Sequence, residues 1–452
     1  MIPSSPLRRP VATLGRAAAL VGVFLAAALL APNGARAQAS TAGMPYMCPA
    51  TCTLPTCHCA SLEPPGGLPR SETPQFVLVT FDDAIQTRIE DDAVELMMRG
   101  IRNPGGRPVH RTYFAQSIWT NIPAAQRVLA AGHEIANHTL HHTTSVNSTE
   151  EEWTRQLDGL DAFMRDTVGV PAGKVVGMRA PFLATNDAMW NVLARRRGML
   201  YESSLTEVFD TQAPMSRGVD RMIWPHTLDG GSATNCVTSN CPRRSVPGLW
   251  SVPMWALYSN VNGRMVGQMD PHQSLDSTSL YNLLMYNFEA RYRGNRAPLG
   301  LFLHAGRIRR KDDAIAGYNR FLREITSRGD VWIVTMRGLV EWMRRPVPLA
   351  RMGAWIDSGA ATGTLVGVAD EGRPGAPTLV VGPNPTRGRA VVHRATGGEA
   401  ADLDVFDALG RRVFSRPVAA GETTAEVVLD GQAPGLYVVR LGRERTTLVV
   451  TR

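Results

Sequence analysis

The sequence predicts an α/β fold, a parallel (β/α) barrel or a doubly wound sheet, followed by a small all-β sandwich. Three observations support this. Apolar strand-like runs alternate with helical patterns through residues 72–346, which is typical of parallel sheets covered by helices. Short apolar runs separated by turn residues fill residues 378–452, as in antiparallel sandwiches. The chain has 452 residues. A single hydrophobic core stops growing at roughly 250 to 300 residues, so a chain of this length predicts two folded domains.

The first 37 residues have the three parts of a secretory signal peptide. Arginines precede an apolar run at residues 17–30, and a small-residue triplet at 35–37 comes directly before Gln38. This order predicts export and a mature protein that begins near Gln38. A membrane anchor is the weaker alternative, because the run is shorter than the roughly 20 apolar residues that span a bilayer. No other stretch of the sequence is apolar and long enough to do so.

The net charge of +8 does not indicate a nucleic-acid partner. Of the 48 basic residues only Lys174 and Lys311 are lysines, and the arginines are scattered along the chain. Four arginines lie in the expected signal peptide, so its removal lowers the net charge to +4. An ordinary solvated surface explains this charge better than a basic patch for a polyanion.

All six cysteines follow the expected cleavage site. Four cluster in a cysteine-rich segment, residues 38–71, and two lie near mid-chain: Cys48, Cys52, Cys57, Cys59, Cys236 and Cys241. An even number of cysteines in an exported chain predicts disulfides, and six cysteines allow 15 pairings. A zinc site is the alternative for the first cluster, but the spacing C-x3-C-x4-C-x-C lacks the C-x2-C pairs of common structural zinc sites.

Strands and helices can be assigned within residues 72–346. Strands are expected at residues 76–81, 111–116, 134–137, 175–178, 199–205, 299–304 and 331–336. Helices are expected at residues 149–168, 187–197, 277–293 and 312–328. The first helix follows Ser148, with Glu151 three residues later, which is the spacing of a capping box. In such folds the functional residues lie in the loops after the C-terminal ends of the strands.

Ionisable side chains follow four of these strands. In chain order they are Asp82 and Asp83, then His138, His141 and His142, then Arg179, and finally His304. Buried strand ends do not collect carboxylates, imidazoles and a guanidinium unless these groups neutralise one another or bind a cation.

These residue types predict metal-assisted hydrolysis of an amide or ester. His138 and His142 would aim two rings at one point if their segment forms a helical turn, and His138 with His141 is the alternative pair. Two imidazoles and one carboxylate suit zinc and, less well, cobalt, nickel, manganese or iron. The second carboxylate would remain as a base that Arg179 pairs with. His304 would protonate a leaving amine; a structural ion pair and a packed histidine are the alternatives for these last two residues.

Four motifs resemble those of the NodB-homology polysaccharide deacetylases, carbohydrate esterase family four. They are TFDDA at 80–84, HTLHH at 138–142, RAPF at 179–182 and FLH at 302–304. The resemblance implies a distorted (β/α) barrel that removes N-acetyl or O-acetyl groups from polysaccharides with a divalent metal. It also implies roles: Asp82 as base, Arg179 as its partner, His304 as acid, Asp83, His138 and His142 as metal ligands, and the backbone N–H of Phe182 at the oxyanion.

Residues 48–342 resemble more narrowly the animal-type chitin deacetylases, including the placement of the cysteines in TCTLPTCHCAS. This resemblance implies chitin or oligomers of N-acetylglucosamine as substrate, with acetylated xylan or peptidoglycan as alternatives. Trp224 and Trp250 are then candidates for stacking on sugar faces, and core packing is the alternative. Two places depart from the family: the segment Tyr201, Glu202, Ser203, Ser204 stands where relatives often have aspartate, and Phe302 stands where an aliphatic residue is usual before His304. A non-catalytic carbohydrate-binding surface protein is the alternative from another class.

A linker rich in glycine, alanine and proline occupies residues 347–377. After it, the segments NPTRG, LDVFDALGRRV and APGLYVVRL resemble the C-terminal sorting domain of proteins exported by type IX secretion. The resemblance implies the type IX machinery as a partner, a secreted or cell-surface location and a mature protein that ends before about Thr378. An accessory carbohydrate-binding sandwich is the alternative, but few aromatic residues there are available to stack on sugars, because Phe406, Phe414 and Tyr437 occupy alternating strand positions that are typical of a core.

Overall fold

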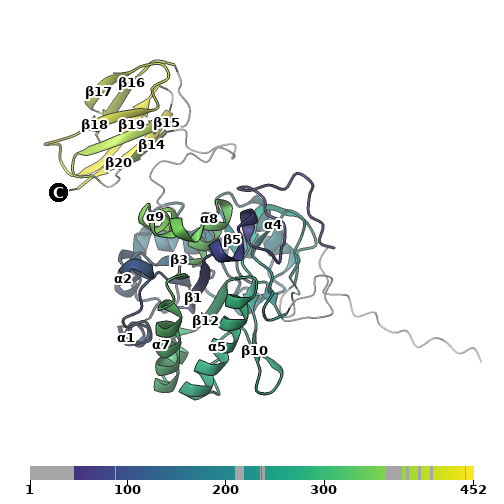
Figure 1. Ribbon diagram of the computed structural model, residues 1–452. Coiled ribbons are helices and arrows are strands. Elements are labelled where there is room, and N and C mark those ends of the chain that lie inside the picture. Colours follow the sequence, from purple (N-terminus) through teal and green to yellow (C-terminus); the bar gives the residue numbers. More distant parts are fainter. Residues whose placement is uncertain are drawn as a thin grey trace, which may run out of the picture. The chain divides into compact units, whose positions relative to one another are not determined.

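The computed structural model describes residues 45–86, 88–208, 218–234, 236, 240–362, 379–382, 386–394, 399–407, 411–442 and 444–451 (Figure 1). The expected signal peptide, residues 363–377 of the expected linker and the Asn384–Pro385 opening of the sorting domain lie outside these residues.

A curled, mostly parallel sheet forms the centre of the larger folded part (Figure 1). Its strand order is β12 (Leu299–Leu303), β1 (Gln75–Asp83), β2 (Thr112–Ala115), β3 (Glu134–Asn137), β4 (Gly177–Met178), β5 (Tyr201–Glu202), β8 (Val246–Ser251) and β7 (His226–Leu228). Strand β13 (Val331–Ile333) pairs with the first residues of β1. Only β7 runs antiparallel to its neighbour. The predicted distorted (β/α) barrel is confirmed. Within the described residues no pairing joins β7 to β12, so the sheet is an open half-barrel.

All seven predicted strands of this part are present, and further short strands were not predicted. Besides β7 and β8 these are the parallel pair β6 (Thr206–Glu207) and β9 (Met254–Trp255) and the hairpin β10 (Leu257–Ser259) and β11 (Arg264–Val266).

The four predicted helices are present as α3 (Glu150–Phe163), α4 (Asp187–Arg195), α5 (Ser277–Arg293) and α7 (Asp312–Thr326). The structure adds α1 (Arg88–Met97), α2 (Ile122–Ala130), α6 (Ala305–Ile308), α8 (Met336–Arg344) and α9 (Met352–Asp357). Among the described residues, no helix has the length and apolar character needed to cross a membrane.

The start of α3 differs from the predicted capping box. Thr149 is the N-cap, and its hydroxyl accepts a hydrogen bond from the backbone N–H of Glu152. The Ser148 hydroxyl instead accepts one from the backbone N–H of Ser145. Both residues can cap a helix, and the turn that precedes the helix decides between them.

The two faces of β1 explain how the half-barrel is packed. Val77, Val79 and Phe81 belong to one apolar cluster with residues of the outer helices α1, α2, α5 and α7. Phe76 and Leu78 belong to a second cluster, which includes five buried tryptophans: Trp224, Trp250, Trp255, Trp332 and Trp342. Side chains alternate between the two faces of a strand. One face of β1 therefore packs against the outer helices, and the other packs against the tryptophan-rich core of the half-barrel.

The C-terminal residues form two antiparallel sheets. One contains β14 (Leu379–Gly382), β15 (Arg389–Arg394) and β18 (Thr424–Val428), and the other contains β17 (Arg412–Val418), β16 (Ala401–Phe406), β19 (Gly435–Leu441) and β20 (Glu444–Val450). One apolar cluster takes buried residues from both sheets, such as Val392 and Val439. Tyr437 is buried in it, and Phe414 packs against it. The predicted all-β sandwich is therefore confirmed.

Candidate active site

The register of the parallel strands brings the predicted residues to one edge of the sheet. Asp83 at the end of β1 lies opposite Ala115 of β2, which lies opposite Asn137 of β3, which in turn pairs with Met178 of β4. The residues that follow these strand ends therefore share one rim. In this way the register brings together residues as far apart in the sequence as Asp83 and Met178.

Asp83, His138 and His142 form a set that could hold a metal ion. One ligand atom of each residue lies within 4.8 Å of the others. Asp83 Oδ1 is 3.2 Å from His142 Nε2 and 3.8 Å from His138 Nε2. Two imidazoles and one carboxylate are the donors of open catalytic zinc sites, so these residues fit a divalent metal.

The backbone around His138 prepares its ring for such a role. Its Nδ1 lies 2.8 Å from the carbonyl oxygen of Arg179, which leaves Nε2 on the side of Asp83. A hydrogen bond of this kind orients the ring of a metal-binding histidine. Burial lowers the pKa of His138 more than the charges of Asp82 and Asp83 raise it, and so favours the neutral imidazole that binds metals.

The segment from His138 to His142 is not the helical turn that we predicted. It is a loop in which Thr139 and His142 have positive φ angles of 67° and 57°. The backbone N–H of Thr139 donates to Asn137 Oδ1, and that of His142 donates to Thr139 Oγ1. These bonds fold the loop back on itself and bring the two rings to a centroid separation of 4.9 Å. His141 is exposed and is not part of the metal-binding set.

Asp82, the neighbour of Asp83, pairs with Arg179. Asp82 Oδ1 is 2.5 Å from Arg179 Nη1, and both side chains are buried. The guanidinium carbon lies 4.0 Å from the ring centre of Phe114 and 5.1 Å from that of Phe302. The unusual Phe302 thus contributes an aromatic face to the arginine, a favourable arrangement for a desolvated cation.

The segment after β5 holds the Arg179 loop in place. Arg179 Nε donates to the carbonyl of Ser203, and the backbone N–H of Ala180 donates to Ser204 Oγ. Glu202 accepts hydrogen bonds from the backbone N–H of Ser204 and from Ser251 Oγ. Burial raises the pKa of Glu202 to about 6, and these hydrogen bonds oppose that shift. Glu202 therefore helps to hold the Ser203–Ser204 segment that contacts Arg179 and Ala180.

His304 completes the group from β12, with a partner that the sequence did not indicate. His304 Nε2 is 3.6 Å from Asp83 Oδ2, and its Nδ1 is 2.6 Å from Asp270 Oδ2. Asp270 Oδ1 also accepts the backbone N–H of His304. Burial by itself lowers the pKa of His304, but the hydrogen bond and charge of Asp270, with the charges of Asp82 and Asp83, raise it overall.

Asp270 was not predicted, because it follows none of the predicted strands and lies in none of the four sequence motifs. It lies in an irregular segment whose neighbour Met269 forms an isolated bridge to Phe302. The only sequence signal is an aspartate next to Pro271, a common turn pair.

Phe182 lies beside the histidine loop. Its side chain is 75% exposed, its φ is 56°, and its ring centre is 4.5 Å from that of His142. The oxyanion role expected of Phe182 belongs to its backbone N–H, and the residue lies within the short 3-10 turn Pro181–Leu183.

The prediction that Trp224 and Trp250 stack on sugars is wrong. Their residues are 0% and 1% exposed, and both belong to the tryptophan-rich core inside the half-barrel. Trp224 Nε1 donates to the carbonyl of Asn295, which accounts for its one polar atom. Neither ring has a face available to a ligand.

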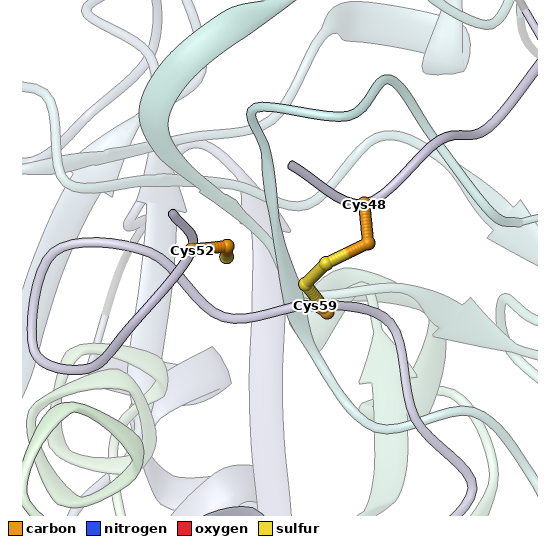
Figure 2. A group of neighbouring side chains, drawn as sticks. All are labelled: Cys48, Cys52 and Cys59. Carbon is orange, nitrogen blue, oxygen red and sulfur yellow. A yellow bond between two sulfur atoms is a disulfide. The ribbon is translucent and has the colours of Figure 1, made fainter. Parts of the chain in front are cut away.

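The cysteines form disulfides and not a zinc site. The bonds are Cys48–Cys59, Cys52–Cys57 and Cys236–Cys241. The sulfurs of Cys48, Cys52 and Cys59 are close enough to hold an ion. Figure 2 shows the bond between Cys48 and Cys59, and the partner of Cys52 is Cys57. Sulfurs used in this way are not available as thiolate ligands.

Comparison with known sequences assigns both parts of the chain. The family model described as Polysaccharide deacetylase matches residues 70–199. Chitin deacetylase 8 of Bombyx mori is 30% identical over 308 residues, which cover 66% of this chain and 78% of that protein. Chitin deacetylase 1 of the same species is 29% identical over 311 residues, covering 65% and 56%. The chain belongs to the polysaccharide deacetylases, carbohydrate esterase family four, which are hydrolases.

The C-terminal part has its own match. The model described as Secretion system C-terminal sorting domain matches residues 380–451. The chain is therefore a polysaccharide deacetylase with a type IX sorting domain, directed outside the cell or to its surface.

Solved structures were also compared. The family 4 acetyl xylan esterase from Clostridium thermocellum, solved in complex with a cobalt ion, is 14% identical. The alignment covers 61% of this chain and 93% of that chain, with a TM-score of 0.36.

Proposed function

We propose that this protein is a metal-dependent deacetylase that hydrolyses the N-acetyl groups of chitin or of N-acetylglucosamine oligomers. The observation that carries the proposal is that two adjacent carboxylates at the end of β1 have different partners. Asp83 lies against His138 and His142, whereas Asp82 is paired with the buried Arg179. A hydrolase of this type needs one carboxylate on the metal and one that can accept a proton.

Asp83, His138 and His142 would hold the metal. Zinc fits this donor set, and cobalt, nickel and manganese are alternatives. A divalent ion held there would polarise the acetyl carbonyl and lower the pKa of a bound water molecule.

Asp82 would act as the general base. With Oδ1 bound to Arg179, its Oδ2 lies 3.9 Å from His138 Nε2, on the side of the metal-binding set. This oxygen would accept a proton from the attacking water. Arg179 fixes the orientation of the carboxylate, because three other hydrogen bonds from its guanidinium hold it to Thr80 and Ser203.

His304 would act as the general acid. Its Nδ1 is held by Asp270, which directs Nε2 towards Asp83 and the reacting group. The raised pKa of His304 favours the protonated form, which can donate to the nitrogen that leaves when the amide bond breaks. The backbone N–H of Phe182 would donate to the developing oxyanion.

The substrate part of the proposal rests on the relatives. Two proteins named as chitin deacetylases are 30% and 29% identical to this chain over the aligned 308 and 311 residues. The type IX secretion machinery is the partner that the sorting domain implies.

The test is acetate release from the N-acetylglucosamine tetramer and from acetylated xylan, with zinc, with cobalt and with a chelator. Wild type and Asp82→Asn are compared, and Asp166→Asn, on an exposed aspartate of the π-helical turn after α3, is the matched control. We expect metal-dependent release from the tetramer that only Asp82→Asn abolishes. Acetate release from acetylated xylan alone would contradict the proposal that chitin is the substrate. Binding of the tetramer without acetate release from any substrate would contradict the activity and favour a binding protein.

A further inference from the structure

A cavity of about 270 Å³ lies at the N-terminal edge of β2 and β3. Glu134, the first residue of β3, lines it and is paired in the sheet with Thr112, the first residue of β2. The metal-binding set is at the other edge, because His138 follows the C-terminal end of β3. The cavity is therefore separate from the candidate active site.

Apolar side chains from three segments line this cavity. They are Leu129 near the end of α2, Ile135 in β3, and Val170 and Pro171 after the π-helical turn Met164–Val168. Ile135 and Val170 are buried, whereas Pro171 is exposed and lies where a ligand can enter from solvent. Walls of this kind favour a hydrocarbon body, since its burial removes apolar area from water.

Two cationic side chains line the same cavity, Lys174 from the loop before β4 and Arg337 from the first turn of α8. Arg337 is partly exposed, but its Nε is buried and has no hydrogen-bond partner within the described part of the chain. Burial and the charge of Arg337 lower the pKa of Lys174, against the effect of Glu341. An anion that contacts both groups would give Nε an acceptor and relieve the repulsion between the two cations.

The carboxyl group of Glu134 is already occupied by other donors. Its Oε2 accepts hydrogen bonds from Thr112 Oγ1 at 2.9 Å and from the backbone N–H of Arg337 at 3.0 Å. Its Oε1 accepts one from the hydroxyl of Tyr201 at 2.8 Å. Burial raises the pKa of Glu134 more than these bonds lower it, which reduces the repulsion that this group would exert on an anion.

The remaining titratable groups near the cavity do not cancel its positive charge. Glu341 is paired with Arg344 at 3.0 Å. His133 lines the cavity as a neutral imidazole, because burial and the charge of Arg111 lower its pKa to about 2. The cavity thus combines an apolar wall with an excess of positive charge.

We propose that this cavity binds a small organic carboxylate, whose carboxylate group contacts Lys174 and Arg337 and whose hydrocarbon body packs against the apolar wall. A guanidinium can hold both oxygens of a carboxylate through parallel N–H donors. Ligand pockets usually enclose roughly 300 to 1,000 Å³, so a cavity of about 270 Å³ suits a small ligand, such as a single ring or a short acyl chain. The proposal is independent of the deacetylase activity.

The first test is calorimetry on the full-length protein with four probes: benzoate, benzamide, acetate and inorganic phosphate. Benzamide has the ring without the charge, whereas acetate and phosphate have the charge without the ring. We expect benzoate to bind at least tenfold more tightly than each of the others. No binding of benzoate would overturn the proposal, and so would equal affinity for benzamide or for the two small anions.

A carboxylate can also bind to a metal ion, so each titration is run with zinc and with a chelator. Binding in this cavity should be the same under both conditions. Benzoate binding that disappears with the chelator would assign the ligand to the metal-binding set and overturn the proposal.

The second test uses variants of the two cations. Arg337→Met and Lys174→Met each remove one charge and keep an unbranched apolar chain, and we expect benzoate to bind at least tenfold more weakly to each. The control is Arg293→Met, on a side chain of α5 that is 78% exposed, and it should bind as wild type does. Wild-type affinity in Arg337→Met and Lys174→Met would overturn the site.

Denaturant unfolding without ligand would show that the variants are folded. Arg337→Lys provides a further check, because it keeps the charge but not the fork of donors, and should recover part of the affinity lost in Arg337→Met. Affinity in Arg337→Lys as low as in Arg337→Met, with unfolding as in wild type, would overturn the role assigned to this charge.

Discussion

Asp82 and Arg179 form an ion pair of 2.5 Å between two buried side chains. Asp82 adjoins the metal-binding residue Asp83 in the chain, and the rings of Phe114 and Phe302 lie against the guanidinium. Arg179 therefore has two effects: it orients the proposed base, and it compensates a charge that burial would make costly.

Removing the arginine should destabilise the protein. In Arg179→Met the carboxylate of Asp82 stays buried without its partner, and such a loss costs about 3 to 5 kcal/mol. Denaturant unfolding of the two proteins would measure it. Arg165→Met is the control, because Arg165 and Asp166 form an exposed pair and such pairs contribute little. Similar midpoints for Arg179→Met and wild type would contradict the compensation argument.

Metal binding should depend on one histidine of the loop and not on its neighbour. His142→Ala removes a group 3.2 Å from Asp83, and we expect its metal content after dialysis to fall at least tenfold. His141→Ala alters an exposed imidazole outside the set and should bind zinc as wild type does. Atomic absorption or calorimetry with zinc would measure both. Equal loss in the two variants would point to a different ligand set.

The pH dependence of activity should report the pairing of His304 with Asp270. Asp270 raises the pKa of His304 against the lowering effect of burial. A general acid works in its protonated form, so activity is present below this raised pKa and is lost as the pH rises through it. Asp270→Asn removes the charge, and the loss on the alkaline side should begin at a lower pH.

The pH profile of kcat/KM would be compared for wild type, Asp270→Asn and a control, Asp313→Asn, on an exposed residue of α7. The control should keep the wild-type profile. If kcat/KM falls at the same alkaline pH in Asp270→Asn as in wild type, the proposal that His304 is the general acid is contradicted.

The six cysteines should all be oxidised. A thiol assay on denatured, unreduced protein is expected to find no free thiol, because the three bonds use every cysteine. Peptide mapping should recover Cys236 and Cys241 in one linked pair. Two or more reactive thiols per chain would be incompatible with these bonds.

Processing at the two ends stays a prediction, together with the domain boundaries. Intact-mass measurement of protein secreted by the native host should give a chain that begins near Gln38 and ends before about Thr378. Secreted protein that retains residues 378–452 would argue against removal of the sorting domain.

Much of the fold could be predicted from local patterns. The seven predicted strands and four predicted helices come from apolar or periodic runs in the sequence, and each is present, although β4 and β5 are only two residues long. Strands β6, β9 and β10 are similarly short and were not predicted. Their place depends on the pairing of distant segments.

The site was predicted in residue type but not in geometry. The strand-end motifs contain Asp82, Asp83, His138 and Arg179, whatever the path of the chain. They do not show that residues 138–142 form a loop with positive φ angles, because local hydrogen bonds to Asn137 and Thr139 decide this conformation.

The sequence by itself therefore determined the class of fold, the chemistry available at the strand ends and the export of the chain. Only the tertiary structure decided which residues meet. It placed Asp270 against His304, buried Trp224 and Trp250, and left Trp119 exposed. The physical reason is that contacts between distant segments follow from strand register and from the way the sheet curls, and the same indole can either fill a core or face solvent.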